Sequence, residues 1–195
     1  MAKHRLLQMW GKPTDPHPAF ALDTFVAGQG PGQMLVAGER TIESARWLRI
    51  LLPIRPNGSA AWVSEDDVRM VPRNQEIVVD LSGRTLSRYE DGKLVERFRV
   101  GVGRPRYPTA IGTFYVWQKV AFHDRFGPYG VYALGLSGFS PVLSDWPGGG
   151  RMAIHGTSDP RDRGKQVSHG CVRVYNRQME TLRNVPLGTP VVIHR

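Results

Sequence analysis

The only cysteine of the chain, Cys171, lies in the run SHGC at residues 168–171. A second histidine-containing run, IHGT, occupies residues 154–157 upstream. A thiol attacks carbonyl carbon atoms as the thiolate, and an imidazole is well suited to accept its proton near neutral pH. Since a lone cysteine cannot form a disulfide within the chain, this grouping predicts a cysteine nucleophile for acyl transfer.

Two histidines are candidates for the base that accepts the thiol proton. His169 lies two residues before Cys171, so in an extended backbone both side chains point to the same side. His155 ends the apolar segment MAIH, which could form a strand running beside the cysteine segment. The residues alone leave the choice between the two histidines open.

Residues next to the thiol fit the other needs of acyl transfer. Gly170 has no Cβ and lets the backbone approach a substrate closely. The main-chain N–H of Cys171 could then donate to the oxyanion that develops during attack. Arg173 is a fixed cation suited to holding a substrate carboxylate in a bidentate grip.

The composition is that of an ordinary globular protein with many turns. Hydrophobic residues make up 41% of the chain and charged residues 22%, and 22 glycines and 15 prolines favour short strands over long helices. The net charge of +9 favours an acidic surface or polymer as a partner. The Lys and Arg residues are scattered and no nucleic-acid motif is present, so we expect no nucleic-acid partner.

The sequence predicts no membrane span, because no apolar run approaches the roughly 20 residues that a spanning helix needs. The first residues, MAKHRLLQMWGKP, also lack the apolar stretch of a secretory signal. Either the protein stays inside the cell, or an export signal lies outside this chain.

Turn residues divide the chain into three parts. Residues 1–24 contain the Pro-rich stretch GKPTDPHP and are expected to form an irregular lead-in. Residues 25–73 are expected to form a small β module, in which Asn-Gly within PNGS at 56–59 predicts a hairpin turn. Residues 74–195 are expected to form a larger β-rich domain.

The larger domain shows strand patterns, one helical pattern and one long loop. The strands are expected at residues 77–81, 85–89, 94–100 and 112–117, and the helix at 176–184. Residues 122–150 are rich in aromatics and glycines without a regular period, which predicts a long loop that forms a wall of the substrate cleft. The expected fold class is mainly β, with one or two short helices.

Two segments resemble known families. HGTSDPRDRGKQVSHGCVRVYN resembles the signature of the YkuD-type L,D-transpeptidases, in which a histidine and a spacer precede Ser/Thr-His-Gly-Cys. The preceding IVVDLSGRTLSRYEDGKLVERFRVGVGRPRYPTAIGTFYV is similar to the start of that catalytic domain, and YALGLSGFSPVL to its loop, so the resemblance covers about residues 76–195. WLRILLPIRPNGSAAWVSEDDV resembles the bacterial Src-homology-3-like barrels attached to cell-wall enzymes, and implies that the small module positions the enzyme on the wall.

The first resemblance implies a role for each residue of the signature. The family's nucleophile falls on Cys171. Its proton acceptor and donor falls on His155, whose ring is oriented in the family by the carbonyl of the next residue, here Gly156. His169 and Ser168 match supporting residues of the signature.

The resemblance also implies a substrate-binding set, which comprises Ser168, Gly170, Arg173 and Asn176. Arg173 stands where many members carry Asn, and the spacer of twelve residues between His155 and Ser168 is shorter than in many relatives. Both departures leave the identity of the acyl acceptor open.

The reaction implied is acyl transfer between peptidoglycan stem peptides through a Cys171 thioester, with release of D-alanine and without a metal or organic cofactor. Acidic cell-wall polymers are expected partners, and β-lactams, above all carbapenems, are expected covalent inhibitors. The family also implies a location in the cell envelope.

Several alternatives compete with this interpretation. A zinc site formed by His155, His169 and Cys171 lacks a fourth ligand at motif spacing. Papain-like wall endopeptidases place the cysteine before the histidine, and sortases lack a Ser-His-Gly-Cys run. A non-catalytic wall-binding module is disfavoured because every residue needed for the chemistry is present. A cysteine L,D-carboxypeptidase of the same fold is not distinguished by the sequence.

Overall fold

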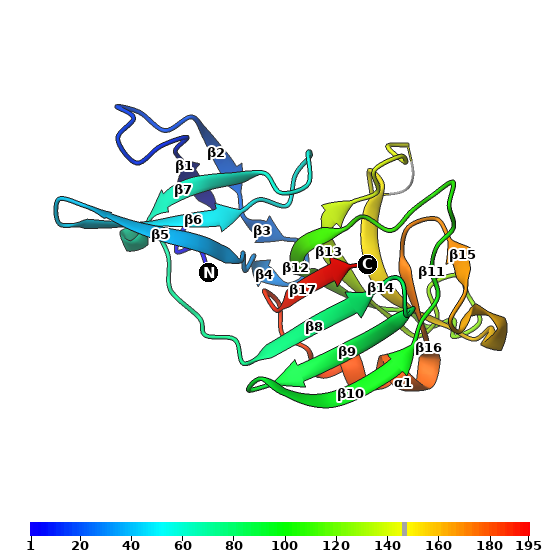
Figure 1. Ribbon diagram of the computed structural model, residues 1–195. Helices are drawn as coiled ribbons and strands as arrows, with labels where there is room; N and C mark the ends of the chain where they lie inside the picture. The colour runs from blue at the N-terminus through cyan, green and yellow to red at the C-terminus, as the bar shows by residue number, and fades with distance from the viewer. Residues whose placement is uncertain (146–147) are drawn as a thin grey trace.

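The computed structural model describes residues 1–145 and 148–195 and consists of two lobes (Figure 1). The N-terminal lobe comprises residues 1–67 and the C-terminal lobe residues 75–195, with an extended segment between them. Each lobe has its own cluster of buried apolar side chains. The mainly β fold with one short α-helix confirms the expected fold class.

The N-terminal lobe is built from short antiparallel strands. Its three-stranded sheet has the order β5-β6-β7, and two smaller pairs, β1-β2 and β3-β4, accompany it. The elements are β1 (Leu6–Met9), β2 (Phe20–Asp23), β3 (Phe25–Val26), β4 (Gly30–Pro31), β5 (Val36–Ile42), β6 (Ala45–Leu51), β7 (Ala60–Ser64) and the 3-10 turn η1 (Glu65–Asp67). The likeness of this lobe to a Src-homology-3 barrel stays a prediction.

The expectation of an irregular lead-in over residues 1–24 is wrong. Strands β1 and β2 pair within this segment, and Leu7 and Met9 are buried in the core of the lobe. A main-chain bridge from Trp10 to Trp62 ties the segment to β7. The strands are missed because the alternation LLQM spans only four residues and is flanked by a Pro-rich stretch.

The C-terminal lobe is an eight-stranded sheet with the order β10-β9-β8-β17-β12-β13-β14-β16, accompanied by the pair β11-β15. Its strands are β8 (Gln75–Asp80), β9 (Thr85–Glu90), β10 (Lys93–Arg99), β11 (Val102–Gly103), β12 (Gly112–Ala121), β13 (Tyr132–Phe139), β14 (Arg151–Thr157), β15 (Gln166–Ser168), β16 (Val172–Tyr175) and β17 (Pro190–His194). Its helical elements are α1 (Asn176–Thr181) and the 3-10 turns η2 (Pro160–Asp162) and η3 (Leu182–Asn184).

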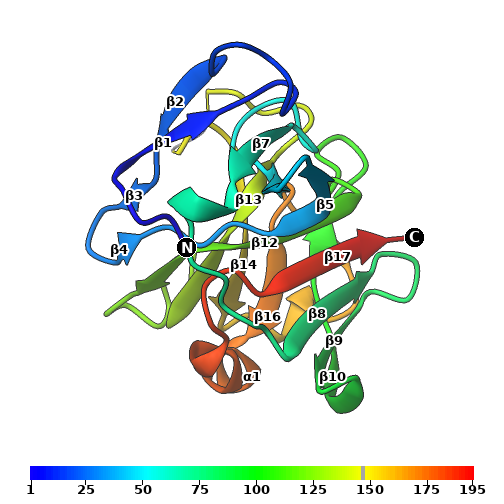
Figure 2. The same ribbon diagram turned by 90° about the vertical axis from the view of Figure 1, so that its left-hand side faces the viewer.

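Strand β12 joins the two halves of this sheet. Its first residues, from Gly112 to Tyr115, pair with β17, and its later residues, from Val116 to Ala121, pair with β13. The buried side chains of the flanking strands form one apolar cluster, in which Phe114 and Val116 take part. In Figure 2 the N-terminal lobe lies in front of β12 and β13, and the Tyr115 hydroxyl donates to Leu51 O across the lobes.

The prediction of a loop over residues 122–150 is wrong for its middle part, where β13 lies between β12 and β14. Seven of the eight residues of β13 are buried, so the strand has no alternation of apolar and polar residues for a sequence reading to detect. Gly138 lies so close to the ring of Phe114 that a Cβ would overlap it, which explains a glycine inside a strand.

The first prediction concerns β1. Replacing Met9, which is fully buried, by Ala should lower the free energy of unfolding of the N-terminal lobe by about 2–5 kcal/mol, because a cavity replaces packed atoms. Leu6→Ala is the matched control, since Leu6 lies on the same strand and is 59% exposed. Urea denaturation followed by tryptophan fluorescence measures both, and equal midpoints would contradict a structural role for β1.

Candidate active site

Parallel pairing of β14 with β16 brings the two histidine- and cysteine-containing runs together. Ile154 lies opposite Val172, and His155 lies opposite Arg173. Because alternate residues of a strand share a face, the side chains of Cys171 and Arg173 point to the same side as that of His155. Cys171 is therefore a diagonal neighbour of His155 across two adjacent strands.

Cys171 and His155 line one pocket of about 70 Å³. His169 and Arg173 line it as well, so four of the side chains expected to do chemistry meet there. The opposite wall is formed by the loops on either side of β13, through Pro128, Tyr129, Ser140, Leu143 and Gly150. Parts of the predicted 122–150 loop thus lie at this pocket although its middle is a strand.

The thiol of Cys171 is half-buried, and its surroundings favour the protonated form. Burial raises the pKa of the thiol above its ordinary value, because a thiolate loses hydration there. A hydrogen bond from the main chain of Ala153 and the charge of Arg173 act in the opposite direction but are smaller.

His155 is buried and neutral. Burial lowers its pKa to about 4, and the nearby charge of Arg173 adds to the lowering. Its Nδ1 lies 2.9 Å from the carbonyl oxygen of Gly156. Because a carbonyl only accepts, Nδ1 carries the hydrogen and donates it, which leaves the lone pair on Nε2 free to take a proton. The ring of Tyr129 packs edge-on against the imidazole at 5.2 Å between centroids.

His169 does not continue an extended backbone to Cys171, which corrects the expectation that both side chains lie on one strand. Strand β15 ends at Ser168, and Gly170 has a φ of +116°, a value that side chains rarely allow. His169 instead contacts Arg104, whose Nη2 lies 2.7 Å from Nε2 of the ring. Burial and the charges of Arg104 and Arg173 lower the pKa of His169.

Ser168 holds the turn that presents the thiol. Its hydroxyl donates to the carbonyl oxygen of Cys171 at 2.5 Å and accepts from the N–H of Gly170 at 3.1 Å. Ser168 is 1% exposed, and its hydroxyl is engaged in these two hydrogen bonds. The structure gives Ser168 a positioning contact at the pocket, and its expected substrate contact stays a prediction.

Asn176 fixes a loop, and its expected contact with substrate stays a prediction. It is the first residue of α1, and its side chain accepts from Val131 N and donates to Arg125 O. The loop held in this way carries Tyr129, the aromatic neighbour of His155. A Cβ on Gly156 would overlap the amide oxygen of Asn176, so this close contact requires glycine.

Arg173 is paired with a buried carboxylate that sequence reasoning did not identify. Its Nη1 lies 3.3 Å from Oδ2 of Asp162, which also accepts from the hydroxyl of Thr157 at 2.7 Å. Asp162 is 4% exposed and Arg173 half-buried. Nothing in the local sequence marks Asp162, because the contact depends on how η2 packs beside β16.

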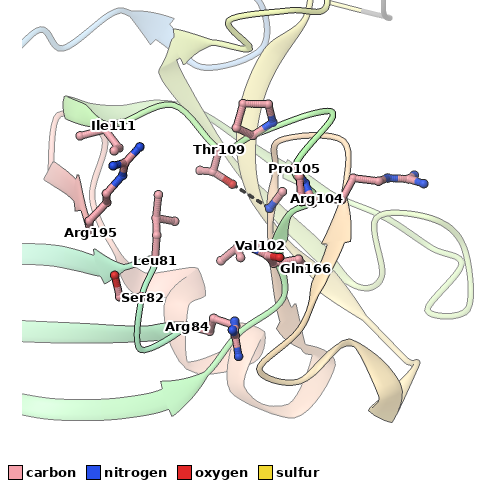
Figure 3. Close-up of a pocket in the computed structure, with 12 residues that line it drawn as sticks. Leu81, Ser82, Arg84, Val102, Arg104, Pro105, Thr109, Ile111, Gln166 and Arg195 are labelled. Atoms are coloured by element: carbon pink, nitrogen blue, oxygen red, sulfur yellow. Dashed lines mark hydrogen bonds between the residues drawn. The ribbon is translucent and has the colours of Figure 1, made fainter.

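A second pocket, of about 280 Å³, lies apart from this chemistry (Figure 3). It shares no lining residue with the Cys171 pocket. Arg84, Arg104 and Arg195 border it, and the side chain of Arg104 points away from the other labelled residues, which agrees with its contact to His169. The smaller pocket is therefore the candidate active site.

Within residues 1–145 and 148–195, no three His, Cys, Asp or Glu side chains are grouped as a metal site. In the same part of the chain, no helix has the length and apolar character needed to cross a bilayer.

Comparison with known proteins shows one consistent family. The model of the YkuD L,D-transpeptidase catalytic domain matches residues 74–193. A putative L,D-transpeptidase YkuD of Bacillus licheniformis is 33% identical over 171 residues, which are 84% of this chain and 94% of that protein.

Two solved structures of L,D-transpeptidases are similar to part of this chain. The Enterococcus faecium L,D-transpeptidase is 28% identical with a TM-score of 0.49, and the match covers 63% of this chain but only 50% of that one. An L,D-transpeptidase of Mycobacterium smegmatis is 14% identical with a TM-score of 0.50, covering 85% of this chain and 100% of that one.

The family model covers more than half of this chain, and the B. licheniformis relative matches over nearly its whole length. This chain belongs to the YkuD family of L,D-transpeptidases.

Proposed function

We propose that this protein transfers acyl groups between peptidoglycan stem peptides through a thioester on Cys171. The observation that carries the proposal is the pocket shared by the chain's one thiol and a neutral His155, whose Nδ1–H is tied to Gly156. That arrangement gives a nucleophile and a base whose orientation is fixed by the main chain. Membership of the family supports the stem peptide as substrate.

The first half-reaction forms the thioester. As the sulfur attacks the carbonyl carbon of the third residue of a stem, Nε2 of His155 takes the thiol proton, and a C–S bond forms. Collapse of the tetrahedral intermediate breaks the C–N bond to D-alanine, and the imidazolium returns the proton to the leaving amine. The N–H of Gly170 is bound to Ser168, which leaves the N–H of Cys171 as the donor for the oxyanion.

The second half-reaction releases the enzyme. A side-chain amine of another stem attacks the thioester, His155 removes its proton, and the sulfur leaves as the thiol when that proton is returned. With water in place of the amine, the same steps give L,D-carboxypeptidase activity. The excess of positive charge, +9, favours binding to acidic cell-wall polymers, and the substrate implies a location in the cell envelope.

The second prediction tests the nucleophile. Incubation with tetrapeptide-stem fragments should add the mass of the acyl group to the protein, and Cys171→Ala should abolish this adduct. A carbapenem should acylate the parent protein at the same residue. Intact-mass spectrometry with peptide mapping measures both, and continued product formation by the variant would rule out the assignment.

The third prediction concerns pH. Because burial raises the pKa of Cys171 and lowers that of His155 to about 4, the pair is neutral at neutral pH. Alkylation of Cys171 by iodoacetamide should keep accelerating above neutral pH, with an inflection above that of an ordinary cysteine. Acyl transfer should be lost on the acid side only as the pH approaches the pKa of His155.

A variant of His155 distinguishes the titration of the Cys171 thiol from that of the imidazole. His155→Gln should leave the alkylation profile in place while acyl transfer falls by about 10²- to 10⁴-fold, the usual contribution of a general base. An alkylation rate that is already constant below neutral pH would indicate a thiolate–imidazolium pair and contradict the neutral pair.

The fourth prediction concerns Arg173, which we propose holds a substrate carboxylate. Arg173→Ala should raise KM or lower kcat/KM about tenfold or more, since hydrogen bonds to charged groups contribute about 1.5–3 kcal/mol. Asp162→Asn is the control, because it removes the partner carboxylate and keeps the cation. If both variants lose activity equally, the ion pair acts by positioning and Arg173 does not bind substrate.

A further inference from the structure

The turn between β6 and β7 reaches across to the C-terminal lobe and contacts the wall of the Cys171 pocket. This turn, residues 52–59, lies beside the end of β13, and two of its side chains, Arg55 and Asn57, contact the C-terminal lobe. The residues that they contact are Phe139, Ser140, Leu143 and Gly149. We call the stretch that contains them, residues 139–145 and 148–151, the wall segment.

Asn57 completes the main-chain hydrogen bonds of the last residue of β13. Its Nδ2 donates to Phe139 O at 2.8 Å, and its Oδ1 accepts from Phe139 N at 2.8 Å. Strand β12 pairs with β13 only as far as Leu136, so Phe139 lies beyond that ladder. The amide side chain therefore occupies the place that a neighbouring strand would take.

Arg55 joins the two arms of the wall segment. Its Nη1 donates to Ser140 O at 2.9 Å, and its Nη2 donates to Leu143 O at 2.7 Å and to Gly149 O at 2.9 Å. Its guanidinium also lies 4.9 Å from the ring centroid of Phe139. One cation thus holds three carbonyl oxygens that come from both sides of the loop.

A reciprocal contact runs in the other direction. Arg151, the first residue of β14, donates to Leu136 O at 2.9 Å and to Pro53 O of the turn at 3.2 Å. Its guanidinium lies 4.4 Å from the ring of Phe139. Both lobes therefore contribute an arginine to the same aromatic ring and the same junction.

The wall segment borders the nucleophile directly. Ser140, Leu143 and Gly150 line the pocket that contains Cys171. A Cβ placed on Gly170 would lie 3.8 Å from Ser140 Oγ, which puts the wall opposite the turn that presents the thiol. The hydroxyl of Ser140 accepts from Leu143 N and so fixes the curve of the wall at this point.

We propose that Arg55 and Asn57 are positioning residues, which hold the wall of the active site from the N-terminal lobe. This inference rests on the proposed function for its effect on catalysis, but not for the contact itself. It gives the N-terminal lobe a part in shaping the substrate site. This role goes beyond attachment of the enzyme to the cell wall, which the resemblance to Src-homology-3-like barrels implies.

The fifth prediction tests both the contact between the lobes and its effect on catalysis. In Arg55→Ala/Asn57→Ala, hydrogen exchange of the Phe139 and Leu143 amides should accelerate at least about tenfold, while amides of β8 and β9 stay unchanged. Acylation of Cys171 by a carbapenem should slow at least about tenfold, whereas alkylation by the small reagent iodoacetamide should stay within about threefold. Arg49→Ala, which removes an exposed cation from β6, is the control.

The outcomes separate the possibilities. The proposal would be overturned if the Phe139 and Leu143 amides of the double variant exchanged hydrogen at the same rate as those of Arg49→Ala. It would also be overturned if these amides exchanged faster while acylation by the carbapenem stayed unchanged. If the parent protein is not acylated at all, the proposed function fails, while the exchange result still decides whether the lobes are coupled. Should the double variant melt at a much lower temperature, Asn57→Ala alone, which removes two hydrogen bonds from an exposed side chain, repeats the test.

Discussion

The parallel pairing of β14 with β16 is the constraint on which the active site depends. The two strands are separated in sequence by η2 and β15, yet their buried residues Ile154 and Val172 lie side by side in the core. Neighbouring strands lie about 4.8 Å apart, so this register fixes how far His155 is from Cys171. A slip by one residue would turn the imidazole to the opposite face, and the burial of Ile154 and Val172 opposes it because the same slip would take them out of the core.

The burial that fixes these side chains also decides their charge. Loss of hydration raises the pKa of Cys171 and lowers that of His155, so both environments oppose a preformed ion pair. In the mechanism we propose, the site therefore depends on a base held ready by Gly156 rather than on a stored thiolate. Arg173 favours the thiolate and disfavours the imidazolium, and its own charge is balanced by buried Asp162.

The sequence predicts the parts of this protein that depend on local residue order. The strands near 77–81 and 85–89, the helix near 176–184 and the mainly β class follow from short-range patterns, and the structure has them. The run SHGC identifies the candidate nucleophile from the sequence because Ser168 hydrogen-bonds to Gly170 and Cys171 within a single turn. The hydrogen bond between Asn57 and Phe139 joins residues 82 positions apart, and no local pattern signals such a contact.

Long-range packing explains the errors as well. Strand β13 is buried on both faces, so its sequence lacks the alternation of apolar and polar residues that identifies a half-buried strand. Because it also contains two glycines, it resembles a loop, and its pairing with β12 and β14 shows it to be a strand. Ser168 and Asn176 lie in the segment that resembles the signature, and the structure adds that their side chains bond to the main chain. A family motif identifies residues that matter without distinguishing those that touch substrate from those that shape the site.

The contact between the lobes is mainly polar, which suits it to positioning a loop of the pocket. Each lobe buries its own apolar cluster, so the junction is not a shared core. The contacts described above are hydrogen bonds from side chains to main-chain carbonyl and amide groups, the packing of Arg55 on the ring of Phe139, and the bond from the buried Tyr115 to Leu51 O. Such bonds are directional and individually modest in net energy. They therefore suit the positioning of a loop better than the stabilisation of the fold, and changing them should alter the shape of the pocket before it unfolds either lobe.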